Sequence, residues 1–269
     1  MSVKLEFEHR PALVQSFSDS WIMIKRSSTH ILRNRDQLLG TFFQPIMFLA
    51  LFATVFGGAI SKALPHGVSY LNFLMAGIII QTIAFGSTTT AIAICNDLSK
   101  GIVDRFRSLP MNNLSVLTGH VISDLLRNTM SLLVMVLTGL ALGFRPKADF
   151  VGWLAIIGMV LLFTLAFSWL SAIVGVFAKS VEAVQWLTFV IVFPLTFASS
   201  AFVPTESMNA GLKIFAVNQP ITQIIETLRA LILGTPMGNH AVLAIIWCLG
   251  ILAVSIPLSS YLFSRRASA

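Results

Sequence analysis

The chain has 269 residues, of which 56% are hydrophobic and only 11% are charged, and its formal net charge is +7. Because a soluble globular domain carries about 25% charged residues, this composition excludes an ordinary soluble protein and indicates an integral membrane protein. The positive charge does not require a nucleic-acid partner, since anionic lipid at the inner membrane surface attracts basic residues.

The first predicted element is an amphipathic helix within a cytoplasmic segment, residues 1–37. Apolar residues recur at helical spacing from 13 to 31, with basic residues among and after them, which is typical of a helix lying along the inner membrane surface. The residues expected to characterise this interfacial helix are Phe17, Trp21, Ile24, Lys25 and Arg26. The segment is polar and mixed in charge rather than a short basic stub, so no cleavable signal peptide is expected.

Six membrane-spanning helices are predicted between residues 38 and 263, which makes the fold class all-α. A helix needs about 20 residues to cross the hydrocarbon core. Five uncharged runs approach or exceed that length: 38–60, 70–95, 150–178, 183–203 and 241–263. The sixth span, 123–144, is weaker because Asp124 and Arg127 occupy its first turns on one helical face. We expect this pair to lie at the membrane boundary or to face protein, with 128–144 crossing.

The distribution of basic residues predicts the orientation of these spans. If both termini face the cytoplasm, that side receives twelve of the 18 Lys and Arg residues: Lys4, Arg10, Lys25, Arg26, Arg33, Arg35, Lys100, Arg105, Arg107, Lys179, Arg265 and Arg266. The opposite side receives five, including the neighbouring Arg145 and Lys147. The positive-inside rule therefore favours cytoplasmic termini, with residues 264–269 as a short cytoplasmic tail.

Residues 97–109 are predicted to form a short two-faced helix in a cytoplasmic loop. On a helix, an apolar stripe opposes a charged one: Leu98, Ile102, Phe106 and Leu109 against Asp97, Lys100, Asp104 and Arg107. Pro110 ends the helix. A helix with one apolar edge and one row of alternating charges suits docking into a groove on a protein partner. The alternative is a solvated connector whose charges only keep the loop out of the bilayer.

This loop also resembles that of a known family. GIVDRFRSLPM, preceded by NDLSK and followed by NNLSVLTGHVISDLLRN, is similar to the cytoplasmic loop of type-two ATP-binding-cassette exporter permeases, in the branch related to the daunorubicin-resistance permease. The positions that match the family pattern are Gly101, Asp104, Arg105, Phe106 and Pro110. Residues 193–234 resemble the family's last-but-one span and the extracellular re-entrant segment after it. Ser99, where many members are acidic, and Gln219, inserted between an Asn and a Pro, depart from the pattern.

The resemblance implies six spans, an interfacial helix, a coupling helix at 97–109 and an extracellular re-entrant segment at 204–240. It also implies two permeases, either two copies of this chain or this chain with a similar permease, together with a dimer of cytoplasmic ATPases in a bacterial inner membrane. The residues expected to contact the ATPase are Asp97, Lys100, Gly101, Asp104, Arg105, Phe106 and Arg107. ATP and Mg would be bound by that partner, and membrane lipid surrounds the chain.

The sequence contains no Gly-x4-Gly-Lys-[Ser/Thr] phosphate loop, so ATP hydrolysis is expected on another chain. It contains no HExxH or GxSxG motif, and Cys95 and Cys248 lie in apolar runs without CxxC spacing. We therefore expect no catalytic residue, cofactor or metal here. A membrane-embedded lipid-modifying enzyme that uses Asp97, Asp104 and His120 is a remaining alternative, as is a structural or signalling subunit.

The substrate class follows from the polarity of the spans. Because no charged residue is expected in their middle, a small ion or sugar in a wet pore is disfavoured. Export of a hydrophobic or amphiphilic compound, such as a drug, a lipid or a lipid-linked metabolite, is the leading hypothesis. The expected substrate path includes Gln81, Thr88 and Thr89, unless the threonines only bond their own backbone. A polysaccharide or teichoic-acid exporter, with aromatic residues along its passage, is the alternative.

Overall fold

The computed structural model describes residues 35–60, 64, 68–100 and 113–266. The predicted interfacial helix and most of the predicted coupling helix lie outside these residues. The described chain is helical throughout, with eleven elements: α2 (Arg35–Val55), α3 (Gly57–Ile60), α4 (Tyr70–Gly86), α5 (Thr88–Ser99), α7 (Asn113–Ala141), α8 (Phe150–Phe177), α9 (Val181–Phe197), a 3-10 helix (Thr205–Ser207), α10 (Ala210–Asn218), α11 (Pro220–Leu233) and α12 (His240–Arg266).

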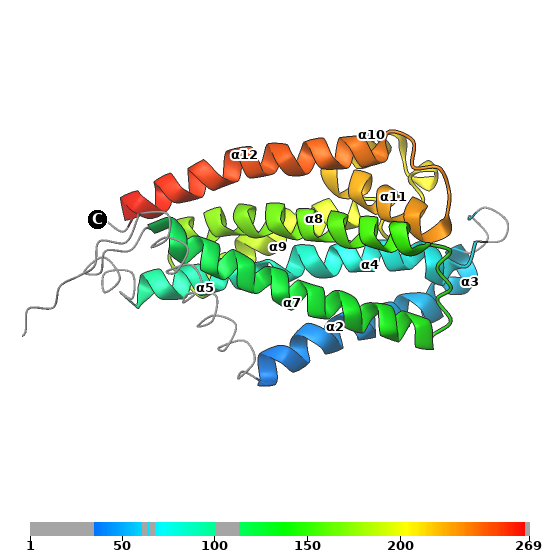
Figure 1. The fold of residues 1–269 in the computed structure, drawn as a ribbon, viewed down its shortest axis with the longest axis horizontal. Coiled ribbons are helices and arrows are strands. Elements are labelled where there is room, and N and C mark those ends of the chain that lie inside the picture. The colour runs from blue at the N-terminus through cyan, green and yellow to red at the C-terminus, as the bar shows by residue number, and fades with distance from the viewer. Residues whose placement is uncertain (1–34, 61–63, 65–67, 101–112, 267–269) are drawn as a thin grey trace, which may run out of the picture.

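The long helices form one elongated bundle (Figure 1). The end of α5, the start of α7 and the end of α12 lie together at one end, which we call the α5 end. There the Cys95 thiol and the Arg266 guanidinium both reach the carbonyl of Ala178, just after α8. The opposite end, the α11 end, contains α3, α10 and α11. Successive long helices therefore run in alternating directions through the bundle.

Within the described residues, four helical stretches are long and apolar enough to cross a membrane: Tyr70–Ser99, Ser115–Ala141, Phe150–Phe177 and His240–Arg266. Two shorter apolar helices, Phe43–Val55 and Val181–Phe197, coincide with the other two predicted spans. The prediction of a multi-pass helical membrane protein is therefore confirmed, whereas the count of six spans stays a prediction. α9 is shorter than its predicted span because the helix ends at Phe197 and the chain turns toward the 3-10 helix.

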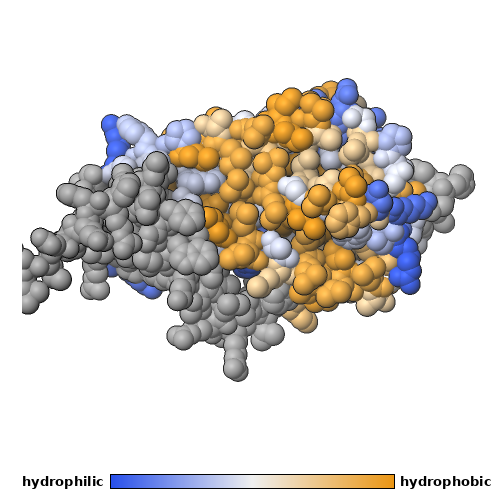
Figure 2. All heavy atoms as spheres, viewed as in Figure 1, coloured by the Kyte–Doolittle hydropathy of each residue, from blue (hydrophilic) through white to orange (hydrophobic). Residues whose placement is uncertain are grey.

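Apolar side chains on the outside of the bundle identify its lipid-facing surface. On the face shown in Figure 2, a broad hydrophobic area separates hydrophilic residues at the two ends. Leu133, Leu154, Ile246 and Val254 are all more than half exposed on the outer helices. A water-soluble protein would bury such residues, whereas lipid tails solvate them at no cost.

Inside the bundle, α4 is buried along most of its length, and α5 packs closely on α8. The α5–α8 contact depends on Gly175, because a Cβ there would collide with the backbone carbonyl of Ala91. Gly77 of α4 has the same role against the backbone of Ala201. Close backbone approach at small residues is a common way for membrane helices to associate.

Replacing Gly175 by alanine is expected to lower the stability by about 1–3 kcal/mol, because α5 and α8 must move apart to admit the methyl group. Gly158→Ala is the matched control on the same helix, since nothing lies within 4 Å of a Cβ there. The midpoint of thermal unfolding in detergent, followed by size-exclusion chromatography, should fall for Gly175→Ala and not for Gly158→Ala. Equal midpoints would show that α5 and α8 are not in tight contact.

Candidate functional site

The α5 end carries the described part of the predicted ATPase contact. Asp97 is buried in the last turn of α5, and Lys100 is exposed just after it. The remaining predicted contacts lie outside the described residues: Gly101, Asp104, Arg105, Phe106 and Arg107. The predicted coupling helix, 97–109, overlaps the end of α5, because α5 continues to Ser99 and Asp97 lies in its last turn.

A carboxylate–imidazole pair joins α5 to α7 at this end. Asp97 Oδ2 lies 3.0 Å from His120 Nε2, and the two side chains are 12% and 11% exposed. Residues 101–112 connect α5 to α7 in the sequence, so the pair joins the two helices that flank that segment. Asp104, the third residue of the lipid-enzyme alternative, lies outside the described chain. Among the described residues, no group of three His, Cys, Asp or Glu side chains could hold a metal ion.

A second polar cluster is buried in the middle of the bundle. The Asp124 carboxylate pairs with Arg127 and accepts a hydrogen bond from the Ser168 hydroxyl of α8. Arg127 Nη2 donates to the carbonyl of Gly86 at 2.5 Å. That carbonyl is available because the helical ladder is interrupted between α4 and α5, where the Thr90 amide bonds Ser87 rather than Gly86. The Arg127 guanidinium thus binds the carbonyl that the interruption leaves without its usual backbone donor.

The expectation that the spans carry no charge in their middle is wrong. α7 begins at Asn113, ten residues before the predicted start, so Asp124 and Arg127 lie near its centre. Their side chains are only 1% and 3% exposed. Of the two expected positions, the membrane boundary or a place facing protein, the structure shows the second. Such charges persist inside a membrane domain because they neutralise each other and find further hydrogen-bond partners.

The predicted substrate path lies along α4 and α5, on both sides of the interruption. Gln81 is buried, whereas Thr88 and Thr89 are partly exposed. The Thr89 hydroxyl donates to the Gly86 carbonyl at 3.0 Å, which is the backbone bonding considered as the alternative for the threonines. Sequence reasoning did not single out Ser87 and Ser171, whose hydroxyls lie 2.9 Å apart and join the interruption to α8. In the sequence, the only feature that could have pointed to these two residues is a hydroxyl group within an apolar run.

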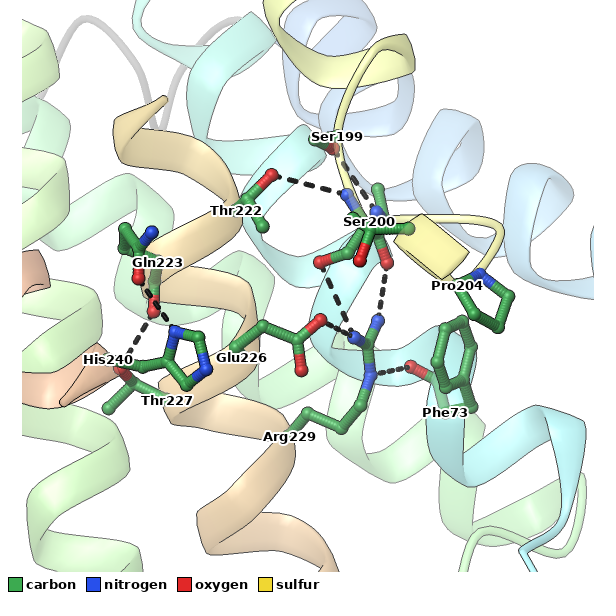
Figure 3. Close-up of polar contacts among 12 residues, drawn as sticks. Phe73, Ser199, Ser200, Pro204, Thr222, Gln223, Glu226, Thr227, Arg229 and His240 are labelled. Carbon is green, nitrogen blue, oxygen red and sulfur yellow. Dashed lines mark hydrogen bonds and ion pairs between the residues drawn. The ribbon is translucent and has the colours of Figure 1, made fainter. Parts of the chain in front are cut away.

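At the α11 end, Arg229 connects three separate segments (Figure 3). Its Nη2 donates to the carbonyl of Ser200 at 2.6 Å, and its Nε donates to the carbonyl of Phe73 at 3.3 Å. Its guanidinium also lies 3.6 Å from the centre of the Phe73 ring and pairs with Glu226 one turn earlier. Burial lowers the pKa of Arg229, and the Glu226 carboxylate opposes that shift. Arg229 therefore fastens α11 to α4 and to the chain after α9.

Gln219, the residue inserted relative to the family pattern, has a structural role. Its side-chain amide donates to the carbonyls of Leu195 and Ala198, at 2.8 and 2.7 Å. These carbonyls belong to the end of α9, where a helix has no backbone donors of its own. Nearby, His240 Nδ1 lies 2.7 Å from the side-chain oxygen of Gln223, which ties the start of α12 to α11 (Figure 3).

An aromatic row follows one face of α9. Ring contacts lead from Trp186 through Phe189, Phe193 and Phe197 to Phe202, with centroid separations of 6.3, 4.9, 4.2 and 5.0 Å. Trp186 is 69% exposed and Phe193 is 38% exposed. The row thus offers an extended aromatic surface over much of the length of α9.

Comparison with known proteins gives a consistent result. Residues 19–233 match the family model described as ABC-2 type transporter. The chain is 29% identical over 257 residues to the "Daunorubicin resistance ABC transporter permease protein DrrB1" of Streptomyces coeruleorubidus, covering 96% of this chain and 90% of that protein. It is 25% identical over 248 residues to the "Probable doxorubicin resistance ABC transporter permease protein DrrC" of Mycobacterium tuberculosis, covering 92% and 88%.

Proposed function

Because this chain belongs to the ABC-2 type transporter family, we propose that it is the membrane-spanning permease subunit of an ATP-driven exporter. The observation that carries the proposal is the family match over residues 19–233, in a chain whose described part is an apolar helical bundle. The sequence has no phosphate loop, so ATP and Mg belong to a partner ATPase dimer. The chain pairs with a second copy of itself or with a similar permease.

In this proposal the chain crosses a bacterial inner membrane six times, with both termini in the cytoplasm. The spans are α2, the α4–α5 pair, α7, α8, α9 and α12. The alternating directions of these helices support this topology, since the ends of α5 and α12 lie at the same end of the bundle (Figure 1). Lys100, Lys179, Arg265 and Arg266 also belong to this end, as the positive-inside rule requires of the cytoplasmic side.

The mechanism proposed is a rigid-body switch driven by the ATPases. When ATP closes the ATPase dimer, it pushes the interfacial helix and the predicted coupling helix, 97–109, whose first residues are the last turn of α5. The movement is transmitted to α5 and α7 together, because the Asp97–His120 pair joins these two helices. α5 meets α4 at Ser87, where the helical ladder is interrupted, so α5 has a place at which it can change its angle to α4. Two stable helix arrangements would then give inward and outward access.

The proposed cargo is a hydrophobic or amphiphilic compound, such as a drug, a lipid or a lipid-linked metabolite. The relatives named for daunorubicin and doxorubicin resistance support this class. The central charged pair does not argue for a wet pore, because Asp124 and Arg127 are buried and bonded to protein. Gln81, Thr88 and Thr89 remain the proposed polar contacts on the substrate path.

Export of a polysaccharide or teichoic acid is the second candidate, and the aromatic row on α9 favours it. Trp186 and the phenylalanines after it form a continuous row of partly exposed rings along most of that helix. Sugar rings pack their C–H faces on such surfaces. A flat aromatic drug would pack on the same row, and the transport of daunorubicin distinguishes the two cargoes.

Daunorubicin is a suitable probe because a relative is named for it. Inside-out membrane vesicles containing the chain and its ATPase are expected to accumulate daunorubicin when ATP is added, which is measured by quenching of the drug's fluorescence. Vesicles without the chain and vesicles given a non-hydrolysable ATP analogue are the controls. If ATP is hydrolysed without drug uptake, and loss of the chain depletes a surface polysaccharide, the second candidate replaces the first.

A further inference from the structure

A cavity that is open to the surface lies at the α5 end of the bundle, between the last turns of α8 and α12. Its volume is about 350 Å³. Three apolar residues and three basic residues line it: Val176, Phe177, Leu262, Lys179, Arg265 and Arg266. Among the ion pairs of the described residues, none involves any of these three cations. The cavity therefore has apolar walls and a positive rim.

One of the three cations, Arg266, joins the two helices that line the cavity. Arg266 donates to the carbonyls of Val176 and Ala178, the latter at 2.5 Å. These carbonyls belong to the end of α8, where the last turn lacks backbone donors and carries the negative end of the helix dipole. Arg266 thereby fixes the end of α12 against α8, and its bonds to protein distinguish it from the other two cations.

Lys179 and Arg265 are placed to bind a ligand. Both are exposed, and the Arg265 guanidinium lies 4.9 Å from the centre of the Tyr261 ring, a contact that leaves its N–H groups available. Guanidinium and ammonium groups are the usual protein partners of phosphate. The rim can therefore hold a phosphate group by charge and by hydrogen bonds.

The position of the cavity favours a lipid phosphate over a soluble one. α8 and α12 are both long enough to span, and the cavity lies where both end. Tyr261 is 53% exposed there, as is typical of Tyr at the boundary between hydrocarbon and headgroups, and Phe177, 72% exposed, adds apolar surface beside it. Apolar walls beside a basic rim suit a molecule with an acyl chain and an anionic headgroup.

We propose that this cavity binds an acidic phospholipid, with its phosphate at Lys179 and Arg265 and an acyl chain along Val176, Phe177 and Leu262. Binding there would brace the ends of α8 and α12 against each other. The site goes beyond the transport function and does not depend on it, because it needs neither the ATPase nor a cargo.

The test uses the purified full chain in detergent with added dioleoyl phosphatidylglycerol, and bound lipid is counted by native mass spectrometry. The double variant Lys179→Gln/Arg265→Gln is expected to bind this lipid about 25-fold more weakly, at about fivefold for each cation removed. The matched control is Lys147→Gln/Lys213→Gln, which removes the same charge from exposed positions toward the α11 end. The control should bind as the unmodified chain does. Dioleoyl phosphatidylcholine should bind weakly to all three proteins.

Equal binding of phosphatidylglycerol by the double variant and the control would overturn the proposal. Displacement of the lipid by inorganic phosphate at similar concentration would also overturn it, because the site would then be selective for a soluble anion. A double variant that keeps the lipid but no longer co-purifies with an ATPase would assign this surface to the ATPase instead. A monodisperse chromatographic profile establishes that each variant is folded.

Discussion

Replacing Arg127 by leucine is expected to destabilise the protein by about 3–5 kcal/mol, because the Asp124 carboxylate would remain buried without its positive partner. Asp124→Leu should cost a similar amount, since Arg127 would then be the unpaired charge. The double variant Asp124→Leu/Arg127→Leu should cost far less than the sum, because it leaves no isolated charge. Thermal unfolding of the four proteins in one detergent measures these differences.

Thr129→Leu serves as the control for that cycle, because it changes an exposed residue of the same helix. It should leave the unfolding midpoint nearly unchanged. If Arg127→Leu behaves like Thr129→Leu, the buried pair is not a structural element of the bundle. If the loss of stability in the double variant equals the sum of the losses in the two single variants, the two charges are not coupled. The contact between Arg127 and the Gly86 carbonyl would then need another explanation.

Reversing the charge of Arg107 to glutamate is expected to reduce ATP-dependent transport at least about tenfold, while the protein still inserts and purifies normally. Arg107 belongs to the charged row predicted to contact the ATPase. Introducing a like charge or removing one partner of a charge pair at an interface costs several kcal/mol. Uptake in inside-out vesicles, normalised to the amount of protein, is the measurement.

Lys213→Glu is the matched charge reversal at the opposite end of the bundle, on the exposed surface of α10. It should leave transport intact. Normal transport by Arg107→Glu would remove the docking role assigned to the charged row, whereas equal losses in both variants would indicate a general effect of net charge.

The long spans could be predicted from the sequence because lipid imposes a simple rule, an uncharged run of sufficient length. The predicted run 150–178 coincides with α8 to within one residue. The start of α7 could not be found in this way, because the charges of Asp124 and Arg127 interrupt the uncharged run. Only their partners on other helices, Ser168 and the Gly86 carbonyl, make them tolerable inside the bundle.

The candidate site was less predictable than the spans, because it depends on contacts between distant residues. Asp97 is predicted to contact the ATPase, and no local spacing indicated that its carboxylate also lies beside His120, 23 residues later in the chain. No proline marks the interruption at Ser87, which is visible only in the backbone hydrogen bonds. The spacing of Glu226 and Arg229, three residues apart, indicates a contact within one helical turn. Arg229 also bonds Phe73 and Ser200, which no local spacing could reveal.

The measurement that tests the central proposal most directly is gentle purification of the chain in detergent from its native host, with mass spectrometry of the proteins that co-purify. A permease of an ATP-driven exporter should bring a soluble ATPase with a phosphate-loop motif, at one ATPase for each permease. If no ATPase co-purifies under conditions that keep other transporters of this kind intact, the chain does not work as the permease of such a complex.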